Sequence, residues 1–133
     1  MKYLQNYASM LLLVPVFILS GFSLQYSSDE IQPTYPGGMK ALFTFFSENL
    51  KYPSEAKQSG IEGKVFLRFE ISKTGAVQNI ETIRGIGYGC DEEAVRIMKN
   101  SIDWNPGTVD GTPVRTSMVL PITFKIDGPE KEE

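Results

Sequence analysis

The residue types that most often carry catalysis are sparse in this chain. Its 133 residues include no histidine, which removes Ser-His-Asp and Cys-His nucleophilic systems, the usual zinc sites and the commonest general base. The acidic residues are scattered, match no calcium-binding loop and are interpreted as solvated side chains. Carboxylate pairs between residues distant in sequence stay open, but nothing points to one. The sequence therefore predicts no enzymatic activity, no cofactor and no metal site.

A glycine-rich segment, Gly85 to Gly89, and the single cysteine, Cys90, precede a predicted helix. Glycines before a helix N-terminus can cradle phosphate, but the spacing here is not G-x-G-x-x-G. Moreover, Asp91, Glu92 and Glu93 in the first turn would repel an anion. We interpret the segment as a tight turn. A helix start can lower a thiol pKa, but the adjacent acids oppose this, so Cys90 is predicted to be a small, partly buried residue.

Two segments have the apolar spacing of amphipathic helices. The first follows Gly37-Gly38 and ends near Asn49; Pro53 stops it, and a brief turn is expected after the proline. The second runs from Asp91 to Ser101, with its acidic residues at the favourable end of the helix dipole. The first apolar stripe comprises Met39, Leu42, Phe43, Phe46 and Leu50, and the second comprises Ala94, Val95, Ile97, Met98 and Ile102.

Three segments have the patterns of β-strands. Lys64 to Ile71 alternates between apolar and polar residues, and a turn containing Gly75 joins it to Val77 to Arg84 as an antiparallel hairpin. The second strand has apolar residues three apart, which predicts a bulge. Val114 to Ile126 alternates again but contains Pro121, which cannot donate to a ladder, so this strand is predicted to be bulged or at a sheet edge.

The order helix, strand, strand, helix, strand predicts an α+β fold. Each strand has one apolar face, which indicates a three-stranded antiparallel sheet with both helices on one side. About 100 residues suffice for one such domain with its own core. We assign residues 24–35 to a polar linker, 36–126 to the domain and 127–133 to a charged tail. The net charge of −3 and the lack of a basic block argue against nucleic acid as a partner.

Residues 1–23 have the order of a secretory signal peptide. A polar start with Lys2 precedes an apolar run from Met10 to Phe22, and small residues follow before an expected cleavage after Ser23. The apolar core of about 13 residues is shorter than the roughly 20 that span a bilayer. Counted from Ala8 to Leu24 it reaches about 17, so an inner-membrane anchor facing the periplasm is the alternative. Both readings place the domain in the periplasm.

A series of motifs resembles the C-terminal domain of TonB proteins, and it covers roughly Pro33 to Ile126. The opening Pro36-Gly37-Gly38 is similar to compact TonB-like members. The motifs are Tyr52-Pro53-Ser54-Glu55-Ala56, then Gly60-Ile61-Glu62-Gly63-Lys64-Val65 with Phe69, then Gly75, Trp104-Asn105-Pro106-Gly107 and Pro121-Ile122-Thr123-Phe124-Lys125-Ile126.

The resemblance implies a non-enzymatic domain that serves energy-dependent transport. In the family, the last strand accepts the N-terminal peptide of an outer-membrane receptor as an added strand, which requires a sheet edge such as the one expected for Val114 to Phe124. The segment around the Tyr-Pro pair also lies close to the receptor in the family. The partner-binding residues implied here are Asn49, Lys51, Tyr52, Pro53, Arg115, Ser117, Val119 and Thr123.

The chain departs from TonB proteins in having no long proline-rich spacer. Its linker of about a dozen residues reaches at most roughly 40 Å when extended, too short to cross the periplasm. Three hypotheses follow. The domain binds receptor peptides as a soluble competitor or adaptor; or it is a structural, assembly or regulatory module whose edge strand pairs with a second copy or another envelope protein; or it is an enzyme, for which no catalytic set is present.

Overall fold

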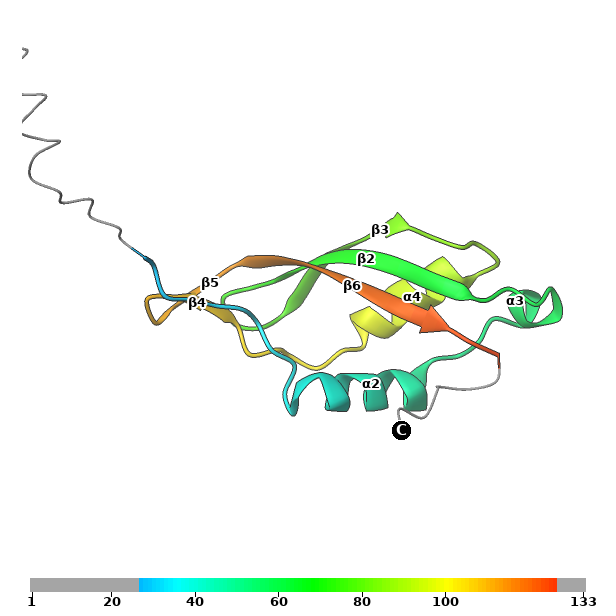
Figure 1. The fold of residues 1–133 in the computed structure, drawn as a ribbon, viewed down its shortest axis with the longest axis horizontal. Helices are drawn as coiled ribbons and strands as arrows, with labels where there is room; N and C mark the ends of the chain where they lie inside the picture. Colours follow the sequence, from blue (N-terminus) through cyan, green and yellow to red (C-terminus); the bar gives the residue numbers. More distant parts are fainter. Residues whose placement is uncertain (1–26, 127–133) are drawn as a thin grey trace, which may run out of the picture.

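The computed structural model describes residues 27–126 (Figure 1). The α+β fold class is confirmed, and the predictions for the leader and for the charged tail lie outside the described residues. No helix in this part of the chain combines the length and apolar content needed to cross a membrane. The elements are β1 (Glu30–Ile31), α2 (Gly38–Asn49), α3 (Ser54–Gln58), β2 (Gly63–Ile71), β3 (Val77–Arg84), α4 (Cys90–Lys99), β4 (Gly107–Val109), β5 (Thr112–Val114) and β6 (Thr116–Phe124).

The main sheet has the strand order β3-β2-β6, with both neighbouring pairs antiparallel. The register between β2 and β6 runs from Gly63 opposite Phe124 to Ile71 opposite Thr116 without a shift. Among the described residues, strand β6 pairs only with β2, so the predicted edge position is confirmed. The long run expected from Val114 to Ile126 is divided at Arg115 into two strands, β5 and β6, which belong to different sheets.

The predicted bulge in the second strand is also confirmed. The register between β2 and β3 shifts twice, and Asn79 has a φ of 51°, in the left-handed region that asparagine tolerates better than most residues. Its side-chain amide donates to the Glu70 carboxylate at 2.6 Å, which ties the bulge back to β2. The bulge explains how Val77 and Ile80, which are three apart, both pack against the core, whereas Ile83 is 42% exposed.

The core lies between the sheet and the two long helices, which are on one side of it (Figure 1). Alternate residues of β2 and β6 point into this core, as their sequence patterns predict. Burial of each large aliphatic or aromatic side chain stabilises the fold by about 1.5–3 kcal/mol. The buried apolar residues of β2, β6 and the two long helices are Leu42, Phe46, Val65, Leu67, Phe69, Ile71, Cys90, Ala94, Ile97, Met98, Leu120, Ile122 and Phe124.

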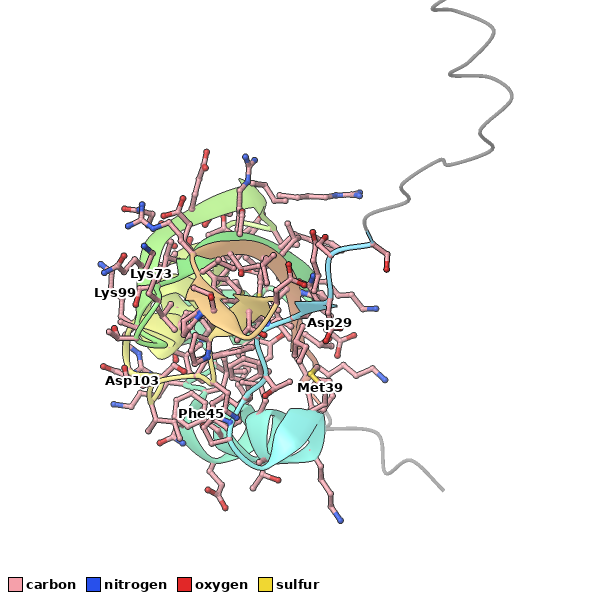
Figure 2. The ribbon with its side chains drawn as sticks, turned by 90° about the vertical axis from the view of Figure 1, so that its left-hand side faces the viewer. Asp29, Met39, Phe45, Lys73, Lys99 and Asp103 are labelled. Carbon is pink, nitrogen blue, oxygen red and sulfur yellow. The ribbon has the colours of Figure 1, made fainter. Side chains whose placement is uncertain are left out.

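The predicted stripe of the first helix was wrong in part, because α2 is rotated about its axis. Met39 and Phe43 are 51% and 56% exposed, whereas Phe45, which was not in the stripe, packs against Tyr35 with ring centroids 6.3 Å apart. Figure 2 shows Met39 and Phe45 on opposite sides of α2. The aromatic partner for Phe45 comes from outside the helix, so helical spacing could not reveal it. Ile102 likewise lies beyond α4 and is exposed.

A second small sheet, with the order β1-β4-β5, was not predicted. Its strands have two or three residues each, too few for a periodic pattern. Strand β1 and the buried Tyr35 lie within the stretch expected to be a linker, so much of that stretch is part of the folded unit. Tyr35 meets Trp104 edge-on at 5.5 Å, and Trp104 also packs on Phe69.

Candidate protein-binding edge

The outer side of β6 is a free sheet edge. Proline has no N–H and cannot donate to β2, yet the register continues through Pro121. The nitrogen of Pro121 therefore points away from β2. Because backbone directions alternate along an antiparallel ladder, the N–H groups of Ser117, Val119 and Thr123 point the same way. No hydrogen bond within the described residues reaches these three N–H groups. All three side chains are exposed, and Val119 is 53% exposed.

Arg115, the fourth residue predicted on this strand, is placed differently. It precedes β6, and its side chain reaches across the open face of the sheet. Its guanidinium donates to Gln78 Oε1 at 3.0 Å and lies 3.5 Å from Glu70 Oε2. An exposed pair of this kind contributes little to stability. Arg115 is therefore partnered within the domain, unlike the outward N–H groups of β6.

The segment around the Tyr-Pro pair lies against the end of β6. The ring of Tyr52 meets the ring of Phe124 edge-on, with centroids 5.7 Å apart, and its hydroxyl donates to the carbonyl of Ile61. Pro53 is half-buried and lies beside Gly89, where an added Cβ would approach the proline ring to 3.2 Å. The structure thus places Tyr52 at the Phe124 end of β6, whereas Arg115 and Ser117 lie toward the other end of the strand.

Two side chains of α4 hold the start of this segment in place. The Glu93 carboxylate accepts the backbone N–H of Lys51 at 2.7 Å and two N–H groups of Arg96 at 2.6 and 2.7 Å. Arg96 also donates to the backbone carbonyl of Asn49 at 2.9 Å. A residue pair from α4 therefore bonds the backbone on both sides of Leu50, where α2 has ended. We call Glu93 and Arg96 the α4 clasp.

Glu93 is an exception to the interpretation of most acidic residues as solvated, since it is buried. Burial alone would raise the pKa of its carboxyl, but the hydrogen bonds from Arg96 and from the Lys51 N–H outweigh it and lower the pKa below the ordinary value. The spacing of Glu93 and Arg96 by three residues on a helix could have indicated the ion pair. Nothing in the sequence pointed to the contact with Lys51, forty-two positions away.

The glycine-rich segment has no free anion site. Asp91 accepts the backbone N–H groups of Ile86 and Gly87, the groups that a phosphate would need. A Cβ at Gly85 would overlap the same carboxylate, which explains the glycine there. Cys90 is fully buried, and burial together with Asp91 raises the pKa of its thiol. The interpretation of this segment as a tight turn agrees with these contacts, and the thiol is not activated.

One family model matches the chain over residues 48–126, and its description is Gram-negative bacterial TonB protein C-terminal. The matched range includes the Tyr-Pro segment, the α4 clasp and all of β6. It leaves out β1, the core residue Tyr35 and most of α2, including the core residue Leu42. No curated protein matches the sequence.

Proposed function

The chain belongs to the family of TonB C-terminal domains, and from this premise we propose that it binds N-terminal peptides of TonB-dependent outer-membrane receptors. The family consists of non-enzymatic protein-interaction domains of the cell envelope, which interact with outer-membrane receptors or other envelope proteins. In our proposal the peptide adds as a strand to the free edge of β6 and also contacts the segment from Asn49 to Pro53.

The observation that carries the proposal is the row of outward N–H groups on β6 beside the Tyr-Pro segment. An unpaired row of this kind is a template for another strand. Each added backbone hydrogen bond contributes about 0.5–1.5 kcal/mol net, so a few such bonds give only modest affinity. Side chains along the edge, such as Val119, would then supply the preference for one peptide over another.

We further propose that residues 1–23 direct export and are cleaved, with the inner-membrane anchor as the alternative. In either form the folded domain, which includes β1 and Tyr35 in addition to residues 36–126, faces the periplasm. Because β1 and Tyr35 are part of the folded unit, the length available to a linker is shorter than residues 24–35. This supports a soluble competitor or adaptor over a domain that reaches across the periplasm to transmit energy.

Changing Val119 to proline tests strand addition directly. The variant removes an outward N–H while leaving the β2 ladder intact, because the nitrogen of Val119 does not face β2. We expect peptide affinity to fall at least about tenfold, which corresponds to about 1.4 kcal/mol. The measurement is a titration with N-terminal peptides of the cell's own receptors, followed by backbone amide shifts. The chain would start at Leu24, since all core residues lie between Tyr35 and Phe124.

Val119→Ala is the matched control, since it removes the side chain and keeps the N–H. Equal losses in both variants would assign the effect to the side chain and would contradict backbone pairing. If the backbone amide signals of the wild-type protein do not shift with any of a full set of receptor peptides, the proposal that the domain binds receptors is contradicted. The family assignment would then stand, and another envelope partner would have to be sought.

A further inference from the structure

We propose that Pro121 prevents two copies of this domain from pairing edge to edge through β6 and restricts the edge to a short extended segment of another protein. This inference deepens the proposed function and rests on the same free edge. It concerns pairing between copies, however, so it is tested without any receptor peptide. Free strand edges invite self-pairing, and proteins manage this with prolines, charges or bulges on the edge.

The other edge strand of the sheet, β3, has a bulge where β6 has a proline. Strand β3 has no neighbour beyond β2, but its bulge places Asn79 at a φ of 51° and interrupts the regular backbone. Its register with β2 is broken on either side of Arg68. Strand β6 has no register shift with β2, so it is a regular template over its whole length. A proline in its middle is therefore the feature that limits what can pair with it.

The outward N–H groups of β6 determine how long a partner strand can pair with it. Outward positions alternate, so the groups available to a partner are those of Ser117, Val119, Pro121 and Thr123. Each offers a carbonyl, but Pro121 offers no N–H. A partner strand finds two consecutive donors at Ser117 and Val119, then a gap, then a single donor at Thr123. The usable window is therefore the half of β6 nearer to β5.

Pairing of two copies would place this gap inside the new ladder. Two sheets joined about a twofold axis meet through antiparallel edge strands, and outward residues then face outward residues. With Val119 opposite Val119, each Pro121 faces a Ser117. Shifting the strands by one step sets Pro121 opposite Val119, and the next step sets Pro121 opposite Pro121. Every register that overlaps at least three of the outward positions thus includes the proline of both copies.

Edge-to-edge pairing of two copies would therefore lack backbone hydrogen bonds at the proline of each copy. A carbonyl that faces Pro121 enters the interface without a donor, and such a buried, unpaired group opposes association. A short peptide avoids the problem, because it pairs with Ser117 and Val119 and can leave the ladder at Pro121, before it reaches the Tyr-Pro segment beside Phe124. The outward side chains of this window are a hydroxyl and an exposed valine, and the β2 residues paired with them are Glu70 and Arg68. The fitting partner is therefore an extended segment with a β-branched or aromatic residue opposite Val119.

The test replaces Pro121 with valine in the chain that starts at Leu24. The substitution adds the missing outward N–H at a position with β-strand backbone, and Thr123→Val is the matched control. The control adds an exposed valine to the same strand without adding a donor. We expect sedimentation equilibrium to show self-association of Pro121→Val at least tenfold stronger than that of either the wild type or Thr123→Val. Amide exchange should slow at Ser117 and Val119 in the self-associated variant.

Two results would overturn the proposal. One is self-association of Pro121→Val no stronger than that of the control, which would mean that the missing donor does not limit pairing. The other is a wild-type dimer with slowed exchange at Ser117 and Val119, which would show that the edge accepts a second copy despite the proline. Neither result depends on receptor peptides. Failure here and failure of the proposed function are therefore separate outcomes.

Discussion

Changing Gly75 to alanine is expected to lower the free energy of unfolding by about 3 kcal/mol or more. Gly75 has a φ of 91°, which an L-residue adopts only under strain. In addition, a Cβ at this position would overlap the backbone carbonyl oxygen of Trp104. That carbonyl cannot move away easily, because the N–H of Trp104 donates to the Gly75 carbonyl at 2.7 Å and its ring is buried in the core.

Gly111→Ala separates the two causes in the Gly75 experiment. Gly111 has a similar φ of 79°, but an added Cβ would have no heavy atom within 4 Å. Urea unfolding of both variants should therefore show a loss of about 1 kcal/mol for Gly111→Ala and a much larger loss for Gly75→Ala. Equal losses would show that the close approach of the hairpin turn to Trp104 contributes nothing.

Changing Glu93 to glutamine is expected to lower stability by about 1–2 kcal/mol at pH 7 and to loosen the segment from Asn49 to Tyr52. Glutamine keeps an oxygen for the Lys51 N–H but loses the charge that holds Arg96, which in turn holds the Asn49 carbonyl. The measurements are urea unfolding and the amide shifts of the segment.

The stabilisation by the Glu93 carboxylate is expected to decrease as the pH falls. Because the pKa of Glu93 is lowered in the folded state, its carboxylate stabilises the fold fully above pH 4.5, the ordinary value for glutamate. That stabilisation is lost as the pH falls through the lowered pKa. The difference in stability between wild type and Glu93→Gln should therefore be large at pH 7 and shrink in acid.

Glu92→Gln is the matched control for Glu93, since Glu92 is exposed in the same first turn of α4. It should change neither the acid dependence nor the shifts of the Asn49–Tyr52 segment. A stability difference between wild type and Glu93→Gln that stays constant from pH 7 into acid would contradict the role of the ionised carboxylate in the α4 clasp.

The regular elements could be predicted from the sequence because each has a pattern that local physics determines. Alternation predicted β2 and β6, a three-residue spacing predicted the bulge near Asn79, and Pro121 predicted an edge. The hairpin turn that contains Gly75 was also predicted from the sequence. Each of these signals depends on residues that are neighbours in sequence, so none required knowledge of tertiary contacts.

The features that could not be predicted all depend on distant residues. Phe45 faces inward because Tyr35 is there, and Tyr35 is held by Trp104 across the core. Glu93 is buried because it bonds Lys51 as well as its helical neighbour. The short strand β1 exists only because β4 lies beside it. In the candidate site, the outward residues of β6 followed from alternation, whereas the contact of Tyr52 with Phe124 required the structure.

Addition of a partner strand to β6 is tested most directly by amide hydrogen exchange of the β6 residues with and without a receptor peptide. Strand addition predicts slowed exchange at Ser117 and Val119, whose N–H groups point outward and are unpaired in the free domain. It predicts little change at Met118 and Leu120, whose N–H groups already face β2. Protection that does not alternate along β6, or that falls on β3 instead, would contradict strand addition to β6.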